Sequence, residues 1–346
     1  MTTYKCDKCD KIFLQNSAYK KHTERKTPCK NKLNVLDLFC GCGGMSQGLT
    51  DAGLNIIAGI DIWDKAINSY KQNYTHKAIC EDLTKFPPEK FNETNNNNID
   101  IIVGGPPCQS YSIAGKRDKN DPRNSLFMEY VKYLNYFKPK AFIMENVIGI
   151  LSKKTDNNEK IIDIILNQLN INYNCIVCKL YASDFGVPQN RRRVIIIGIR
   201  KDLNIKPTAP EPINSVENRV AVKTIILPKE EIDKSYFLSE KAINGINNKK
   251  QKSKAEGKGF GAQFLDMNKP SYTIPARYWK DGYDALVKYS DSDIRRLTIL
   301  ELKRIQSFPD DYTIYGSKKD IIMQIGNAVA CKFAYHLGIH IKKLLS

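Results

Sequence analysis

The first two hundred residues contain short apolar runs that each end at a glycine, a proline or an acidic residue. Aliphatic runs bounded in this way are typical of buried parallel strands. A glycine-rich turn at residues 40–44 follows the first run, and a helix is predicted from about Met45 to Ala52. This order predicts an α/β fold with a doubly wound sheet. Strands are expected at residues 35–39, 55–60, 99–103, 141–144 and 194–199.

Acidic residues follow two of the early strands. Asp61 ends the second strand, and Asp82 lies where we expect a third, short strand to finish, at Asp82-Leu83. Carboxylates at such ends suit ribose hydroxyls and an adenine amino group. The turn between the first strand and helix lacks the spacing G-x-G-x-x-G. A nucleotide-like ligand is therefore indicated, and a nicotinamide oxidoreductase is disfavoured.

A cysteine stands directly after the strand at 99–103. The sequence Gly104-Gly105-Pro106-Pro107 ends that strand abruptly, and Cys108 is the next residue. Ligands of open α/β sheets bind beyond the carboxyl ends of the strands, so Cys108 is a candidate nucleophile. The alternative is a buried structural cysteine, which is the usual fate of an isolated one.

The N-terminal thirty residues have the spacing of a small ββα zinc finger. Cys6, Cys9 and His22 supply three tetrahedral ligands, and Cys29 is the expected fourth. The segment resembles a C2HC-type finger with an unusually long gap before the last cysteine. Zn²⁺ would stabilise a unit too short to fold on apolar burial alone. The alternative is a disordered basic tail that binds no metal.

Composition points to a polyanionic partner. The 346 residues carry a formal net charge of +17, which favours nucleic acid, although a lysine-rich proteome gives the same balance. No N-terminal stretch resembles a signal peptide, and no apolar run approaches membrane-spanning length. We therefore expect an intracellular protein, cytoplasmic or nuclear, that is not secreted and keeps its ten cysteines reduced, metal-bound or catalytic.

Five ordered motifs resemble those of the DNA cytosine-5 methyltransferases, from about Leu33 to the C-terminus. They are Asp37-Leu38-Phe39-Cys40-Gly41-x-Gly43-Gly44, Gly105-Pro106-Pro107-Cys108-Gln109, Glu145-Asn146-Val147, Gln189-x-Arg191-x-Arg193 and Gln324-Ile325-Gly326-Asn327-Ala328-Val329. The resemblance implies an S-adenosylmethionine-dependent Rossmann-like sheet with a smaller target recognition domain. The implied division is 1–31 for the finger, 33–200 for the catalytic domain, 201–321 for target recognition and 322–346 for a segment that returns to the catalytic domain, with a final helix at about 328–345.

The resemblance implies covalent catalysis on cytosine. A thiolate of Cys108 that adds to C6 makes C5 nucleophilic toward a methyl group. Glu145 would act as the acid at the Watson–Crick edge of the base, where it relieves the charge at N3 as the thiolate adds. Arg193 would bind O2 of the base. Arg191 would steady the catalytic loop and a phosphate. The family match also places Gln189 in this catalytic set.

The implied methyl donor is S-adenosylmethionine. The residues implied to line its site are Asp37, Phe39, Gly41, Gly43, Asp61, Ile62, Asp82, Leu83, Pro106, Leu126, Asn327 and Ala328. Two positions depart from the family pattern. The family often has glutamate where Asp61 stands and an acidic residue where Trp63 stands. Aspartate is one methylene shorter than glutamate, which reduces its reach toward a ribose.

Double-stranded DNA is the implied substrate, bound by a monomer away from any membrane. The implied DNA contacts are Ser110, Lys116 and Arg117 of a catalytic loop at about 110–123, together with Arg277 in the recognition region. Arg277 suits either a guanine or a phosphate. A cognate restriction endonuclease is compatible with the sequence, which does not decide whether one exists.

Two alternatives share part of this pattern. A transfer-RNA cytosine methyltransferase of the same family would carry a Cys-Phe-Thr signature in the recognition region, and no cysteine lies between Cys178 and Cys331. A catalytically silent DNA-binding protein would not need Cys108, Glu145 and Arg193 together. Both are less consistent with the sequence than a DNA methyltransferase.

Overall fold

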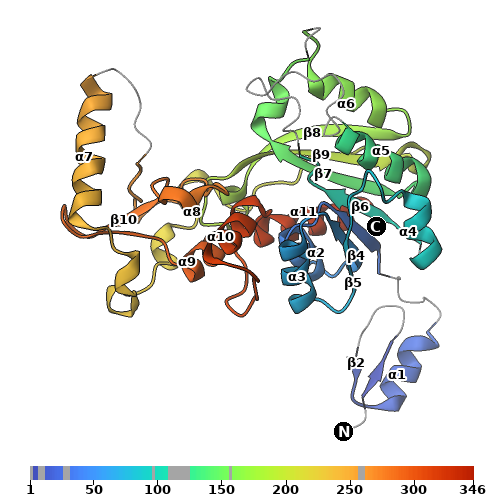
Figure 1. The fold of residues 1–346 in the computed structure, drawn as a ribbon. Coiled ribbons are helices and arrows are strands. Elements are labelled where there is room, and N and C mark those ends of the chain that lie inside the picture. Colours follow the sequence, from blue (N-terminus) through green and yellow to red (C-terminus); the bar gives the residue numbers. More distant parts are fainter. Residues whose placement is uncertain are drawn as a thin grey trace.

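A seven-stranded, mostly parallel sheet forms the centre of the protein (Figure 1). The computed structural model describes residues 3–6, 12–25, 32–95, 98–107, 125–155, 158–255 and 262–346. The strand order is β5-β4-β3-β6-β7-β9-β8, in which β9 runs antiparallel to both neighbours. The strands are β3 (Asn34–Leu38), β4 (Asn55–Asp61), β5 (Lys77–Cys80), β6 (Ile101–Gly104), β7 (Ala141–Val147), β8 (Tyr173–Tyr181) and β9 (Arg192–Arg200).

Helices cover both faces of the sheet, as the doubly wound prediction requires. Alternate residues of a strand face opposite sides, so Ile102 joins one apolar cluster while its neighbour Ile101 joins the other. The first cluster includes residues of α4 (Pro88–Asn95), α5 (Ser125–Phe137) and α6 (Ile161–Leu169), and the second includes residues of α2 (Gly44–Asp51) and α11 (Cys331–Leu344). The helix α3 (Asp64–Asn73) follows β4.

The C-terminal segment returns to the first helix of the sheet. Gly48 of α2 packs so closely on α11 that an added Cβ would lie 2.1 Å from the carbonyl oxygen of Cys331. The helix predicted at about 328–345 is present as α11 but begins three residues later, at Cys331, because Ala328 and Ala330 adopt extended backbone angles. A separate helix, α10 (Lys318–Asn327), precedes it.

Two further predictions of strand ends need correction. The third strand, β5, ends at Cys80, so Asp82 and Leu83 lie in the turn beyond it rather than at its end. Strand β7 continues to Val147, which places Glu145 within the strand. The extra length follows from its pairing with β9, where Glu145 lies opposite Ile195.

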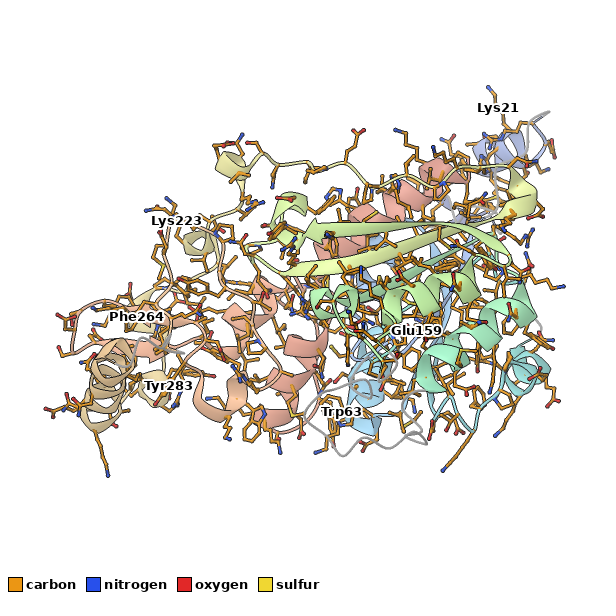
Figure 2. The ribbon with its side chains drawn as sticks, turned by 90° about the horizontal axis from the view of Figure 1, so that it is seen from above. Lys21, Trp63, Glu159, Lys223, Phe264 and Tyr283 are labelled. Carbon is orange, nitrogen blue, oxygen red and sulfur yellow. The ribbon has the colours of Figure 1, made fainter. Side chains whose placement is uncertain are left out.

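A second region packs around its own apolar clusters. It contains α7 (Glu240–Ala255), α8 (Tyr278–Asp281), β10 (Leu286–Lys288), β11 (Ile294–Arg296) and α9 (Ile299–Ile305), and α10 packs against it through Ile322 and Ile325. Figure 2 shows Phe264 and Tyr283 of this region at the end of the molecule opposite Lys21. Across both regions, the 3₁₀ helices within the described residues are η3 (Ile148–Leu151), η4 (Ala182–Phe185), η5 (Lys201–Leu203), η6 (Val216–Asn218), η7 (Val222–Thr224), η8 (Lys229–Glu231) and η9 (Lys234–Tyr236).

A buried ion pair fixes the middle of this second region. Both terminal nitrogens of Arg295 lie 2.8 Å from the carboxylate oxygens of Glu301, and both side chains are fully buried. Glu301 also accepts from the backbone nitrogens of Leu227 and Thr298, and with Thr298 it forms the capping box of α9. One carboxylate thus links β11, α9 and the segment at 227.

The N-terminal unit has the predicted ββα arrangement. Strands β1 (Tyr4–Lys5) and β2 (Ile12–Phe13) pair antiparallel, and α1 (Asn16–Thr23) packs on them, with Tyr19 against both Tyr4 and Phe13. Cys6 is buried, and the His22 ring lies against Phe13. Cys9 and Cys29 lie outside the described residues. No group of three or more metal-ligating side chains occurs within the described part of the chain.

Among those same residues, no helix is both long and apolar enough to span a bilayer.

Candidate active site

A cavity of about 790 Å³ opens at the carboxyl ends of β3, β4, β6 and β7. We call it the carboxyl-end cavity. Eleven of the twelve residues predicted for the methyl donor line it: Asp37, Phe39, Gly41, Asp61, Ile62, Asp82, Leu83, Pro106, Leu126, Asn327 and Ala328. Asn327 and Ala328 come from the end of α10, so residues far apart in the sequence close one chamber.

Gly43 is the predicted residue that does not line the cavity. It holds a left-handed conformation with φ of 98°, and an added Cβ would lie 2.6 Å from the Tyr312 hydroxyl and 2.7 Å from the Tyr74 ring. Gly43 is therefore needed for the turn and for close packing, because a side chain would be both strained and obstructed.

The glycine turn is tied to the end of β4. The Asp61 carboxylate accepts hydrogen bonds of 2.9 Å from the backbone nitrogens of Gly41 and Trp63. A carboxylate has further lone pairs, so Asp61 retains acceptor capacity for a ligand. Phe39, just before the turn, has φ of 60°, a conformation that a residue with a side chain adopts at a cost of about 1–2 kcal/mol. Such strain concentrates at ligand sites.

The cavity wall is acidic although the chain is strongly basic. Five carboxylates line it against one lysine among the described lining residues, in a protein of net charge +17. The acidic residues are Asp37, Asp61, Glu81, Asp82 and Glu145, and the lysine is Lys153. Burial raises the pKa of both Asp37 and Asp61. The wall thus favours a ligand that carries positive charge.

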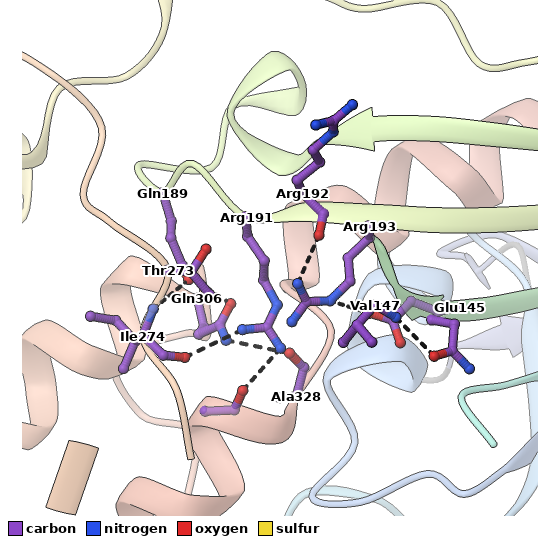
Figure 3. A network of polar contacts seen from close by, with 12 residues as sticks. Glu145, Val147, Gln189, Arg191, Arg192, Arg193, Thr273, Ile274, Gln306 and Ala328 are labelled. Carbon is purple, nitrogen blue, oxygen red and sulfur yellow. Dashed lines mark hydrogen bonds and ion pairs between the residues drawn. The ribbon is translucent and has the colours of Figure 1, made fainter. Parts of the chain in front are cut away.

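Glu145 and Arg193 meet at the end of the sheet. Glu145 Oε1 lies 2.6 Å from Arg193 Nε, and both side chains are largely buried (Figure 3). The contact is an ion pair in which the Nε–H is not aligned as a hydrogen bond. Arg193 instead donates from Nη1 to the carbonyl oxygen of Arg192. This arrangement holds one carboxylate and one guanidinium at the same edge.

The turn that precedes Cys108 is fixed against Glu145. A Cβ on Gly105 would lie 3.2 Å from Glu145 Oε2, and Asn146 donates from its side-chain nitrogen to the carbonyl oxygen of Pro106 at 3.0 Å. Pro107 lines the same cavity as Glu145. The last described residues before Cys108 are therefore beside the predicted acid. Cys108 itself lies outside the described residues, as do Ser110, Lys116 and Arg117.

Arg191 is buried at the junction with the second region. Its Nη2 donates to the carbonyl oxygen of Gly326 at 2.9 Å, and Nη1 donates to that of Ile274 at 3.4 Å. Burial, and then the nearby Arg193, lower the pKa of Arg191 to about 9. The guanidinium remains charged at neutral pH and joins the residue just before β9 to α10 and to the segment at 274.

Gln189 lies at the same junction and is fully buried. Its amide nitrogen donates to Gln306 Oε1 at 3.1 Å, and its oxygen accepts from the Ile274 nitrogen at 3.0 Å (Figure 3). Gln306 in turn donates to the carbonyl oxygen of Ile325. The amide of Gln189 is thus engaged in joining the two regions rather than directed to a ligand.

Arg277 is on the surface of the second region. Its side chain is 77% exposed and lies 3.4 Å from the Asp284 carboxylate. This exposure leaves it available to a large partner.

Residues that sequence reasoning did not assign also line the cavity. Asn146 and Glu81 are the clearest cases, together with Trp63, which the sequence marked only as a departure. Asn146 stands inside the motif Glu145-Asn146-Val147, and that position was the available signal. Glu81 follows β5 directly, but one carboxylate beside Asp82 gives no pattern of its own.

The chain matches a known protein family over most of its length. A family model described as C-5 cytosine-specific DNA methylase matches residues 33–343. The chain belongs to this family. The methylase is 34% identical to the Type II methyltransferase M.FnuDI of Fusobacterium nucleatum, over 91% of this chain and 95% of that protein. It is also 34% identical to M.SsoII of Shigella sonnei, over 86% of this chain and 77% of that protein.

Solved structures show the same fold. The methylase resembles a DNA modification methyltransferase encoded within an E. coli prophage, with a TM-score of 0.70 and 26% identity over 91% of this chain and 99% of that one. It also resembles DNMT2 of Spodoptera frugiperda, with a TM-score of 0.71 over 91% of this chain and 100% of that one, but the identity of 21% supports the fold alone. The chain is thus a methyltransferase of the C5-cytosine DNA class, and the nicotinamide oxidoreductase alternative is excluded.

Proposed function

We propose that this methylase transfers a methyl group from S-adenosylmethionine to C5 of a flipped-out cytosine in a specific DNA sequence. The observation that carries the proposal is the carboxyl-end cavity. Its acidic wall includes Glu145, and the turn that leads to Cys108 lies beside Glu145 in the same wall. Cytosine must leave the duplex because C6 is inaccessible within the stack. The cavity would hold S-adenosylmethionine, and Glu145 in its wall would contact the flipped-out cytosine.

The residues of the cavity suit S-adenosylmethionine, which supplies an electrophilic methyl group when bound. Asp61 would accept from the ribose, Asp82 from the adenine amino group, and Ile62, an apolar side chain on the cavity wall, would pack on the adenine. The acidic wall would balance the positive charge of the donor. Its volume of about 790 Å³ lies within the range of small-molecule sites.

The chemistry on the base would use the chain's own side chains. The Cys108 thiolate would form a bond to C6, and Glu145, after taking a proton from solvent, would donate that proton at N3 as negative charge develops there. After C5 takes the methyl group, water would accept the C5 proton, and the electrons of that C–H bond would restore the C5–C6 double bond as the Cys108 thiolate leaves C6. The proton at N3 would then return to Glu145. Arg193 would hold O2 of the base and orient Glu145 through their 2.6 Å contact.

Arg191 and Gln189 would act by position. Both are buried at the junction of the sheet with the second region, and their partners include Ile274, Gln306 and Gly326. We assign residues 201–321 to target recognition and 322–346 to the returning segment. In this division Arg277 would contact DNA from the recognition side, and Ser110, Lys116 and Arg117 from the catalytic loop.

The test is transfer of tritium from methyl-labelled S-adenosylmethionine to unmethylated plasmid DNA and, separately, to total transfer RNA. We expect label in DNA and none in RNA. Label in RNA alone would favour the transfer-RNA alternative. DNA binding without any label would favour the silent DNA-binding protein.

We also propose that the N-terminal ββα unit binds one Zn²⁺ through Cys6, Cys9, His22 and Cys29. Its support is the arrangement of β1, β2 and α1, a buried Cys6, and a His22 ring held against the small aromatic core.

Type II relatives support a role in a restriction–modification system, with a cognate endonuclease as the proposed companion.

Metal analysis tests the finger. We expect about one zinc per chain in the wild type and none in Cys6→Ser, since a structural site with three ligands loses its closed tetrahedral shell. Cys175→Ser is the matched control, because Cys175-x2-Cys178 repeats the spacing of Cys6 and Cys9 but lies in strand β8. Zinc retained by Cys6→Ser would contradict the assignment.

A further inference from the structure

A buried chain of hydrogen bonds leads from the carboxyl-end cavity toward the surface. Ser46 Oγ donates to Asp37 Oδ2 at 2.6 Å, Ser46 Oγ and Tyr70 Oη are 2.7 Å apart, and Tyr70 Oη lies 2.9 Å from His76 Nε2. Asp37, Ser46 and Tyr70 are almost completely buried, whereas His76 is half-buried after α3. Asp37 lines the cavity, so the chain joins the ligand site to a group near solvent.

The hydrogen bonds of this buried chain can all be donated in either of two directions. When Asp37 is ionised, each donor points toward it, and His76 carries its proton on Nε2. When Asp37 is protonated, each donor points away from it, and His76 accepts at Nε2 and carries its proton on Nδ1. The tautomer of His76 is therefore coupled to the charge of Asp37, while Tyr70 and Ser46 stay neutral in both states.

The electrostatics of the chain suit such a change. Burial raises the pKa of Asp37 to about 7, with Ser46 opposing and Asp61 adding to the shift. Burial lowers the pKa of His76 to about 4, so its ring is neutral near pH 7 and free to hold either tautomer. Among the described residues, the titratable groups whose charge interacts with Asp37 are Asp61, Cys40, Tyr70, Tyr74 and Tyr130.

We infer that Ser46, Tyr70 and His76 are positioning residues that exchange a proton with Asp37 when the charge of the ligand changes. The inference rests on S-adenosylmethionine being the ligand of the cavity. The donor carries a sulfonium cation that its demethylated product lacks. Binding the donor ionises Asp37: one proton passes along each link toward His76 Nε2, and His76 releases its Nδ1 proton to solvent. The reverse sequence restores the proton once the sulfonium is gone.

The sign of the pH dependence follows from linkage. A cation beside Asp37 favours the ionised carboxylate, so binding releases a proton wherever Asp37 of the free protein is protonated. Affinity for S-adenosylmethionine should fall about tenfold from pH 8 to pH 6, with roughly half a proton released at pH 7. S-adenosylhomocysteine should show little of either effect, because it differs at the sulfonium alone.

Calorimetry in two buffers of different ionisation enthalpy measures the released protons. The wild type should release protons with S-adenosylmethionine and not with S-adenosylhomocysteine, and Asp37→Asn should release none with either. Equal release for both ligands, or release retained in Asp37→Asn, would overturn the inference. Failure of both ligands to bind the wild type would overturn the proposed cofactor instead.

Nitrogen-15 NMR of the histidines tests the chain itself. The His76 signals should move from the Nδ1–H to the Nε2–H tautomer when S-adenosylmethionine is added, and Tyr70→Phe should abolish that change while the ligand still binds. His340→Gln is the control and should leave the His76 tautomer change intact, since His340 lies on α11 and contacts Thr208 instead. A His76 tautomer that ignores the ligand in the wild type would contradict the coupling.

Discussion

Replacing Glu145 by glutamine is expected to slow methyl transfer by about 10²–10⁴-fold, the usual contribution of a positioned acid or base. The amide keeps the shape of the side chain but cannot deliver a proton to N3. It also loses the ion pair with Arg193, whose Nε lies 2.6 Å from the carboxylate. Single-turnover methylation of DNA at saturating S-adenosylmethionine measures the loss.

Glu81→Gln is the matched control. Glu81 also lines the cavity, but it follows β5, an edge strand. Three strands separate β5 from β7, which carries Glu145. We expect this variant to change donor affinity and to leave the single-turnover rate within about threefold, because uniform binding effects do not alter the chemical step. If Glu145→Gln kept the wild-type rate, Glu145 would not be the acid.

Replacing Glu301 by glutamine is expected to destabilise the second region by about 3–5 kcal/mol, the typical cost of breaking a buried pair. Arg295 would keep its charge with no exposure to water, since both partners are fully buried. The bonds from Leu227 and Thr298 would also weaken. Urea unfolding followed by tryptophan fluorescence measures the change, because Trp279 lies in this region.

Two further variants separate the ion pair from general sensitivity. Glu231→Gln removes an exposed carboxylate of the same region and should change stability by less than about 0.5 kcal/mol. The double replacement Arg295→Met with Glu301→Leu removes both charges and should recover the part of the loss that comes from the unpaired arginine. The loss of the acceptor for the Leu227 and Thr298 nitrogens should remain. A Glu301→Gln protein as stable as wild type would show that the pair does not organise the region.

Short-range patterns explain why much of the sheet and cavity could be predicted. Each apolar run and the residues at its end determine both a strand and side chains that line the cavity, as for Phe39, Asp61 and Pro106. The same locality explains why eleven of the predicted donor residues reach one cavity. Parallel strands present their carboxyl ends at one edge.

Other features depend on contacts that no local pattern records. Gly43 lies outside the cavity because Tyr70, Tyr74 and Tyr312 close on it, and Tyr312 is distant in the sequence. Gln189 is turned to Gln306 and Ile274 by the docking of the second region. That region itself has strands of three residues and several 3₁₀ turns, which give little periodicity to recognise.

The most direct test of the central claim is bisulfite sequencing of DNA from a methylation-free bacterial host that expresses the protein, beside a host that expresses Cys108→Ala. The account predicts methylcytosine at one recurring short sequence in the first host and none in the second. Methylation at the same sequence by Cys108→Ala would contradict covalent catalysis through Cys108. No methylation by a folded wild type that binds S-adenosylmethionine would contradict cytosine in DNA as the substrate.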